Sequence, residues 1–439
     1  MDARGLAALA ALLLWPGLVV VRAPWPAVPF LSVSFWLLTW WWAPSGPGRS
    51  ALLGAALLFF VLLSAVRLLK PLGASVPSRG TILVLVLAGA CLVPFFGLEV
   101  APGTSLASVE AMLAVWRDGF PSTYEPLVPI PAFGAHAPGL PFLAADLSLL
   151  SGLAPHRAVA LVSLASAGLL VIAVAFLARR MGCFALGGVG ALAVAAITLL
   201  LAARGGPAPG PAVLAAALGL AAVALLVRGS GRSPAVAAGV FLAAALTVEA
   251  AAAVLAALAA AGCPERSRHL LALTLTLGLA TPRLAGLQAW TPAEARAALG
   301  SVGNDGSTPA PDRDGLRAMT WVRDHTGPLD HVCVRAGGPG WFLPSIGERA
   351  VVPAEVPFSY RDEALAGRRN RARAGCRYAL SFGPLDPGEG PFAPSDAPST
   401  PNAQQVFSAG PVRVFEAASA NDSITSFDTP TGNPPAPRP

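Results

Sequence analysis

The sequence predicts an all-α polytopic membrane domain followed by a small C-terminal α/β domain. Apolar runs of the length of a membrane-spanning helix fill the first 290 residues, and the composition then becomes that of a soluble domain. In the whole chain 54% of the residues are hydrophobic and 12% are charged, whereas soluble domains have about 25% charged residues. We therefore expect a membrane domain over residues 1–290, a soluble domain over 291–417 and a disordered tail over 418–439.

A helix needs about 20 apolar residues to cross the hydrocarbon core of a membrane. The runs that meet this requirement are 5–22, 27–43, 51–69, 80–98, 155–178, 183–203, 211–229 and 269–290. The run at 140–153 is short and contains Asp146, so it is a re-entrant segment or a weak span. The run at 234–262 is too long for one crossing and has Glu249 near its middle, which predicts two short crossings or a broken pair. The total is about 9 to 11 membrane segments.

Residues 99–153 form the long polar interruption between the apolar runs, and we interpret them as an outer loop. Apolar residues recur at helical spacing in its first part, at Val109, Met112, Leu113, Trp116 and Phe120. This spacing predicts an amphipathic helix that lies on the membrane surface. Six prolines between residues 121 and 141 exclude a continuing helix after it. The loop therefore gathers polar side chains at one face of the bilayer.

The positions of the basic residues predict the orientation in the membrane. Short loops that are rich in Arg and Lys usually face the cytoplasm. Four short loops have this composition: those containing Arg67 to Arg79, Arg179 and Arg180, Arg228 and Arg232, and Arg266 and Arg268. If these loops are cytoplasmic, the loop at 99–153 and the soluble domain both face outward, and so does the N-terminus.

The soluble domain has strand and helix patterns in alternation. A surface helix is predicted at 314–326, strands at 331–336, 348–352 and 376–382, a charged helix at 361–374, and a possible fourth strand at 411–417. This order favours a largely parallel sheet. Much of 383–404 lacks periodicity, and we expect it to be disordered. Cys333 and Cys376 form a disulfide if the domain is extracytoplasmic, or are reduced core thiols otherwise.

Several function classes are excluded by what the sequence lacks. There is no basic tract or motif for nucleic acids, no phosphate-binding glycine loop and no Ser/His/Asp array. The five cysteines show no metal-ligand spacing, and neither do His136 and His156, which are separated by prolines. We expect no cofactor and no metal site.

Three stretches together resemble a known family. The first comprises AMLAVWRDGFP at 111–121 and APGLPFLAADLSLLSGLAPHRAVAL at 137–161. The second is the pair of apolar segments at 237–262 and 268–282, and the third comprises LRAMTWVRDHT at 316–326 and WFLPSIGERAVV at 341–352. These stretches are similar to the GT-C class of integral-membrane glycosyltransferases, the relatives of the dolichyl-phosphate-mannose and lipid A aminoarabinose transferases.

The resemblance implies a polyprenyl-phosphate-linked sugar as donor and a carboxylate on the first outer loop as the catalytic base. In the family this carboxylate is commonly an Asp at the start of the interfacial helix. This chain has Thr104, Ser105 and Leu106 there, and hydroxyl groups do not accept a proton unaided at neutral pH. Glu99 and Glu110 are the nearby substitutes. Glu110 is also explained as an acid in the first turn of a helix, and Glu99 as an ordinary interfacial carboxylate.

Other side chains are candidates for binding the substrate. Arg117, Arg157 and Arg283 could hold a donor phosphate through a planar guanidinium, or could serve only as anchors at the membrane interface. His136 could assist an acceptor. Asp146 lies in an apolar run, so it belongs to a site or to a structural ion pair with a partner such as Arg157.

The sequence therefore predicts a glycosyltransferase of the bacterial inner membrane, which transfers a sugar to an extracytoplasmic glycan or lipid acceptor. One alternative is a catalytically degenerate relative, a membrane scaffold that binds envelope glycan or partners, which the missing Asp favours. Another is a transporter, which the few intramembrane polar groups and the lack of an obvious internal repeat argue against.

Overall fold

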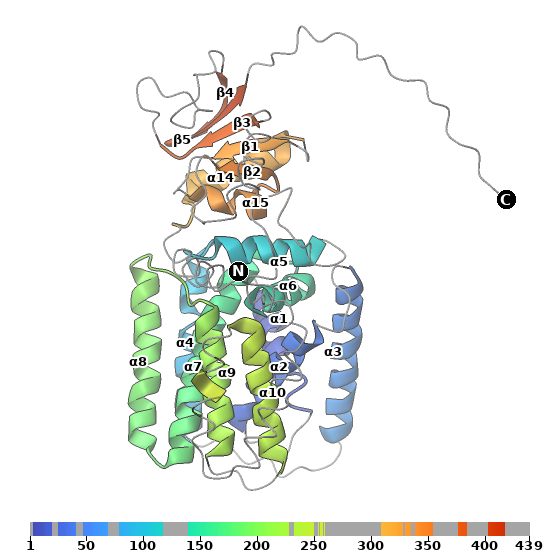
Figure 1. The fold of residues 1–439 in the computed structure, drawn as a ribbon, viewed down its shortest axis with the longest axis vertical. Helices are drawn as coiled ribbons and strands as arrows, with labels where there is room; N and C mark the ends of the chain where they lie inside the picture. The colour runs from blue at the N-terminus through green and yellow to red at the C-terminus, as the bar shows by residue number, and fades with distance from the viewer. Residues whose placement is uncertain are drawn as a thin grey trace, which may run out of the picture.

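The computed structural model of the chain describes residues 3–19, 25–40, 47–68, 79–116, 139–227, 232–249, 253, 255–257, 259, 309–327, 330–334, 339–353, 376–383 and 403–417. This described part is predominantly helical and has a small mixed sheet near the C-terminus. The helices form a bundle, and the sheet with its helices stands at one end of that bundle (Figure 1).

The bundle contains helices from both sides of the loop at 99–153. Before this loop lie α1 (Ala3–Leu14), η1 (Trp25–Ala27), α2 (Val28–Thr39), α3 (Pro47–Leu68), α4 (Arg79–Ala90) and η2 (Val93–Phe96). Within and after it lie α5 (Ser105–Trp116), α6 (Gly139–Ser151), α7 (Pro155–Met181), α8 (Phe184–Ala203), α9 (Pro211–Leu226) and α10 (Arg232–Val248). α10 ends at Val248, directly before Glu249, and the two short crossings or broken pair predicted for 234–262 stay a prediction because most residues of this run after Glu249 lie outside the described part.

Three of the described helices, α3, α7 and α8, are long and apolar enough to cross a membrane by themselves. The other apolar helices of the described part are shorter, and the total of about 9 to 11 segments stays a prediction. α1 is one of the short ones, since it ends at Leu14 and not at residue 22. Pro16 and Gly17 follow this end, and the Gly17 amide donates a hydrogen bond of 2.9 Å to Oγ of Ser32 on α2. A turn therefore joins α1 closely to α2.

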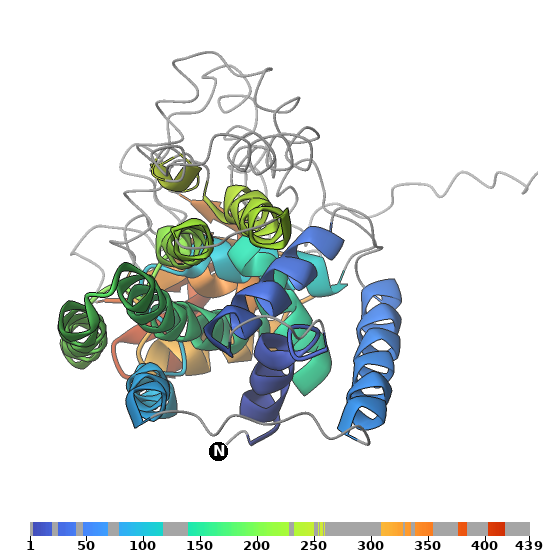
Figure 2. The same ribbon diagram turned by 90° about the horizontal axis from the view of Figure 1, so that it is seen from below.

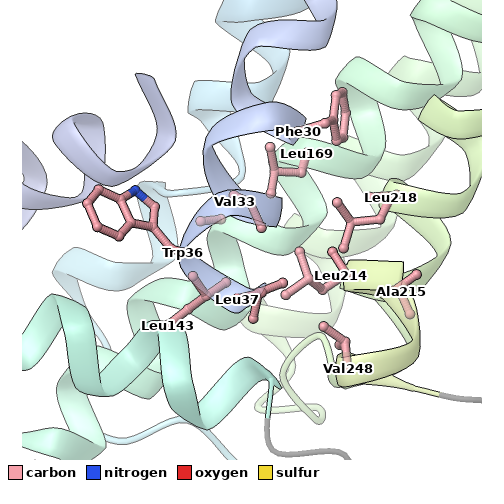
Figure 3. Close-up of a cluster of buried hydrophobic side chains, with 14 of the residues drawn as sticks. Phe30, Val33, Trp36, Leu37, Leu143, Leu169, Leu214, Ala215, Leu218 and Val248 are labelled. Carbon is pink, nitrogen blue, oxygen red and sulfur yellow. The ribbon is translucent and has the colours of Figure 1, made fainter. Parts of the chain in front are cut away.

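The core of the bundle lies between α2, α6, α7, α9 and α10. Figure 3 shows its central side chains, with Phe30, Val33, Trp36 and Leu37 of α2 packed among Leu143, Leu169, Leu214, Ala215, Leu218 and Val248. α7 is mostly buried, whereas α3 and α8 are mostly exposed and stand at opposite edges of the bundle (Figure 2). The exposed side chains of α3 and α8 are largely apolar, among them Leu58, Phe59, Leu186 and Val189. Such surfaces are typical of contact with lipid.

α5 runs across the end of the bundle, between the bundle and the C-terminal domain (Figure 1). It contacts α6 and α7 on one side, and η3 (Pro339–Phe342) and α15 (Leu343–Ile346) of the C-terminal domain on the other. The sequence correctly predicts this helix but not its environment. Ser108 and Glu110, which fall outside the predicted apolar face, are buried. α5 is enclosed between the bundle and the C-terminal domain, whereas we expected it on a membrane surface.

The C-terminal domain has five described strands in the order β2-β1-β3-β5-β4. They are β1 (His331–Val334), β2 (Ala350–Pro353), β3 (Cys376–Ser381), β4 (Ala403–Ala409) and β5 (Val412–Ala417). β1 pairs in parallel with β2 and β3, whereas β5 pairs antiparallel with β3 and β4. The sheet is therefore mixed and not largely parallel. β4 was not predicted, and the tight turn at Gly410, with φ of 53°, makes β4 and β5 a hairpin whose strands must run antiparallel.

The predicted surface helix is confirmed as α14 (Arg313–His325). The carboxylate of Asp312 caps it by accepting a hydrogen bond of 2.7 Å from the Gly315 amide. Its buried face contributes Ala318, Met319 and Val322 to a core that also includes Val100 from the loop at 99–153. The predicted helix at 361–374, the tail at 418–439, most of 383–404 and the span at 269–290 lie outside the described residues.

Cys333 of β1 and Cys376 of β3 form a disulfide between adjacent strands. The structure thus decides between the two alternatives that the sequence left open. The bridge joins two residues that are 43 positions apart in the sequence, and it therefore lowers the conformational entropy of the unfolded chain. We expect the double substitution Cys333→Ala, Cys376→Ala to lower the free energy of unfolding of this domain by about 2–4 kcal/mol. Thermal unfolding with and without a reductant measures this effect, and Cys183→Ala, at an exposed free thiol, should leave the unfolding temperature unchanged.

Arg349 joins the start of β2 to the end of α14. Its buried guanidinium donates hydrogen bonds of 2.6 Å to the Arg323 carbonyl and 2.7 Å to the Thr326 carbonyl, and one of 2.9 Å to Thr326 Oγ1. Lysine cannot make this planar set of contacts. We expect Arg349→Lys to destabilise the domain by about 1–3 kcal/mol in chemical unfolding. Arg317→Lys, at an exposed position of α14, is the matched control, and equal losses in both variants would contradict this role.

Candidate functional site

The end of the bundle that faces the C-terminal domain carries several of the predicted site residues. We call residues 95–116 and 155–157 of the bundle, together with 339–346 of the C-terminal domain, the interfacial layer. Glu99, Glu110 and Arg157 lie in this layer, and Asp146 lies in α6 beneath α5. Arg117, His136 and Arg283 lie outside the described residues.

Glu110 is a buried carboxylate on α5, with 3% of its surface exposed. One helical turn further along, Ala114 packs in a buried cluster with Trp40, Phe142 and Ala145. The backbone before it is held in place, because Thr104 Oγ1 donates to the Ala101 carbonyl at 2.6 Å and Ser108 Oγ to the Thr104 carbonyl at 2.8 Å. Glu110 is thus carried on a fixed helix between the bundle and the C-terminal domain.

Glu99 differs from Glu110 in its surroundings. It follows η2 in an irregular segment, and its side chain is exposed. The next residue, Val100, is buried in the core of the C-terminal domain, and the Pro102 carbonyl accepts a hydrogen bond of 3.1 Å from the Ala208 amide. The chain around Glu99 is therefore fixed at the junction of bundle and domain, while its carboxylate points away from both cores. The two candidate bases therefore lie in different environments, since Glu99 is exposed and Glu110 is buried.

A buried ion pair lies beneath α5, and the sequence offers a structural ion pair for Asp146 as one alternative but does not identify its partner. Arg49 of α3 donates to both carboxylate oxygens of Asp146, from Nε at 2.8 Å and from Nη2 at 2.7 Å, and neither side chain is exposed. Nη2 also donates to the Trp36 carbonyl at 3.2 Å. The guanidinium lies 4.5 Å from the centre of the Trp40 ring, which stacks on Phe142 at 4.6 Å.

This geometry assigns Asp146 a structural partner. The partner is Arg49 and not Arg157, and both carboxylate oxygens are engaged. Asp146 is therefore not available to a substrate in this conformation. The pair fixes the first turn of α3, a peripheral helix, to α6 in the bundle. It thereby also holds the Trp40 and Phe142 platform on which the end of α5 rests.

The first turn of α7 collects positive charge in the interfacial layer. Pro155 begins this helix, and the Arg157 guanidinium lies over the Phe95 ring of η2 at 5.3 Å. His156 Nδ1 is buried and has no hydrogen-bond partner among the described residues. Arg323 of α14 is close enough to His156 to interact with it electrostatically. The positive end of the helix dipole adds to this charge, so this turn suits an anionic group.

The ion pairs on the surface of the C-terminal domain are ordinary. The Arg323 guanidinium lies 2.9 Å from a carboxylate oxygen of Asp324 and lowers the pKa of this exposed acid through their hydrogen bond. Burial raises the pKa of Tyr378, whose hydroxyl donates to Glu416 at 3.2 Å. Within the part of the chain that the structure describes, no group of three or more His, Cys, Asp and Glu side chains could hold a metal ion.

The comparisons with known proteins add no identification. No protein-family model matches the sequence, and no match was found among curated proteins. The functional argument therefore depends on the interfacial layer and its chemistry.

Proposed function

We propose that the protein is a membrane glycosyltransferase that moves a sugar from a polyprenyl-phosphate donor to an acceptor outside the cytoplasm. One observation supports this proposal best: the carboxylate of Glu110 lies on a helix that runs between an apolar bundle and a folded polar domain. A lipid-linked sugar needs this combination, because its tail stays in hydrocarbon while its phosphate and sugar stand at the interface.

Glu110 is the base in this proposal. Its carboxylate takes the proton of an acceptor hydroxyl, the hydroxyl oxygen bonds to the anomeric carbon of the sugar, and the bond from that carbon to the phosphate oxygen breaks. Polyprenyl phosphate leaves with the bonding electrons. A carboxylate that is shielded from water suits this role better than the exposed Glu99, because exclusion of water strengthens its interactions with the reacting groups.

Arg157 is the residue we assign to the donor phosphate. It lies in the first turn of α7, where the guanidinium and the positive end of the helix dipole both attract an anion. The unpartnered Nδ1 of His156 supplies one more polar atom beside it. Arg117, Arg283 and His136 keep their sequence-based assignments, since they lie outside the described residues.

Two observations support an extracytoplasmic position for the interfacial layer. The disulfide between Cys333 and Cys376 is a bond that forms and persists in oxidising compartments. At the opposite end of α7, Arg179 and Arg180 occupy the last turn, as expected for the cytoplasmic end of a span. We place the protein in a bacterial inner membrane on this basis.

The burial of Glu110 also favours a second candidate, a catalytically inactive scaffold that binds envelope partners. An assay of sugar transfer distinguishes the glycosyltransferase from the inactive scaffold. The purified chain in proteoliposomes is given polyprenyl-phosphate-linked hexoses and pentoses with envelope extract as acceptor, and the release of polyprenyl phosphate is followed. The glycosyltransferase predicts release with at least one donor, which heat-denatured protein does not produce. A lack of release with every donor would contradict catalysis and favour the scaffold.

A further inference from the structure

The bundle contains an apolar groove at its other end, away from the C-terminal domain. Its volume is about 410 Å³, within the range of about 300–1,000 Å³ that is usual for ligand sites. The C-terminal half of α7 forms one wall, α4 and the start of α8 form a second, and the end of α1 with η1 and the start of α2 form a third.

The lining of this groove is apolar except at one place. Arg179, in the last turn of α7, is the one charged side chain among the residues that line it. Arg180 follows directly but does not line the groove, and its guanidinium lies over Phe176 at 5.5 Å. The groove therefore has a long apolar wall and, at the end where α7 stops, the single positive charge of Arg179.

Two exposed glycines lie at the edge of the groove. A Cβ atom at Gly89 of α4 or at Gly188 of α8 would meet no atom within 4 Å. A large side chain can therefore be placed beside the groove at either position without a clash at Cβ. α4 and α8 also present exposed apolar side chains nearby, such as Leu83, Val86 and Phe184, which are suited to lipid.

We propose that this groove binds an acyl chain of an anionic membrane phospholipid, whose phosphate pairs with Arg179. An apolar cavity does not hold water, and acyl chains are the apolar molecules available to a bundle in a bilayer. A guanidinium binds phosphate oxygens in bidentate fashion, and the cytoplasmic leaflet is the one rich in anionic lipid. The site is separate from Glu110 and does not depend on glycosyl transfer, because it lies at the opposite end of α7.

Photocrosslinking of the full chain tests this proposal. The probe is phosphatidylglycerol with a diazirine in its acyl chain, in vesicles of phosphatidylcholine, and mass spectrometry maps the crosslinks. We expect crosslinks on α4, α7 and α8 at the groove, with unlabelled phosphatidylglycerol competing about fivefold better than phosphatidylcholine. Crosslinks spread evenly over the exposed face of α3, or equal competition by the two lipids, would overturn the proposal.

Substitutions test whether the crosslinks form in the groove or on the general lipid-facing surface of the bundle. Gly89→Trp and Gly188→Trp should each fill the groove and reduce crosslinking at least about fivefold. Gly54→Trp is the matched control, since Gly54 is an exposed helical glycine of α3 with no atom within 4 Å of a Cβ and does not line the groove. Unchanged crosslinking in folded Gly89→Trp and Gly188→Trp variants would exclude the groove as the site.

Two further variants test whether the lipid phosphate pairs with Arg179. Arg179→Gln should remove the roughly fivefold preference for phosphatidylglycerol, which is the effect of about 1 kcal/mol for one basic residue near an anionic lipid surface. Arg180→Gln, which changes the neighbouring charge outside the groove, should keep most of that preference. An equal loss in both variants would show attraction by the basic helix end as a whole, and not by the groove.

Discussion

An Asp146→Ala variant is expected to lose about 3–5 kcal/mol of stability, because it leaves the Arg49 guanidinium buried without its counter-ion. Neither side chain of the pair is exposed, so water cannot replace the missing carboxylate. Nη1 of Arg49 already lacks a hydrogen-bond partner within the described residues, and the substitution would leave Nε without one as well. Thermal unfolding in detergent measures the loss.

A double variant provides the control for this prediction. Arg49→Met with Asp146→Leu removes both charges and fills the space with apolar side chains, and it should recover most of the stability lost by Asp146→Ala. We expect the double variant to unfold close to the wild-type temperature, with α3 still attached to α6. Asp146→Ala unfolding at the wild-type temperature would contradict the role of the pair in fixing α3 to the bundle.

A Glu110→Gln variant is expected to lower kcat for sugar transfer by about 10²–10⁴-fold, the usual contribution of a general base. Glutamine keeps the size of the side chain but cannot accept the proton of the acceptor hydroxyl. The binding of the donor should change little, since its phosphate is assigned to Arg157 at the start of α7. Steady-state kinetics with the donor identified by the release assay measure both quantities.

Glu99→Gln is the matched control, because it makes the same chemical change at an exposed position of the same loop. We expect it to retain wild-type kcat. Unfolding temperatures of both variants should be equal to that of the wild type, which excludes misfolding as the cause of a loss. If Glu110→Gln keeps full activity and Glu99→Gln loses it, Glu99 is the base. If both variants keep full activity, neither residue is the base.

The sequence predicts local features of this protein well. Helical spacing in residues 109–116 predicts α5, and apolar residues spaced among charges at 314–326 predict α14. Each of these features depends on neighbours within a few residues, so a pattern in the sequence is enough to find it.

Features that depend on distant contacts could not be predicted in this way. α5, which carries the buried Glu110, is enclosed by α6 and α7 and by η3 and α15, and the last two are more than 200 residues away along the chain. The partner of Asp146 is 97 residues away, and Arg49 stands next to a turn-like GPGR sequence that suggests an ordinary loop cation. A buried Asp does require a cation, but the sequence offers several, and only packing selects Arg49.

β4 shows another reason why part of the fold could not be predicted from the sequence. Residues 403–409 contain two glutamines and little apolar alternation, and the segment before them resembles a disordered linker. The strand forms because β5 pairs with it across the turn at Gly410. Its stability thus comes from a neighbour and not from its own propensity.

Thiol labelling tests most directly whether the interfacial layer faces away from the cytoplasm. In a Cys263→Ala background, Cys183 is the exposed free thiol of the described residues and lies between α7 and α8, at the end of the bundle away from α5. A Ser408→Cys variant adds a thiol at an exposed position of β4. With a membrane-impermeant maleimide on intact spheroplasts, the account predicts labelling of the Ser408→Cys variant at once and of Cys183 only after permeabilisation. Labelling of Cys183 in intact spheroplasts, with Ser408→Cys protected until permeabilisation, would contradict it.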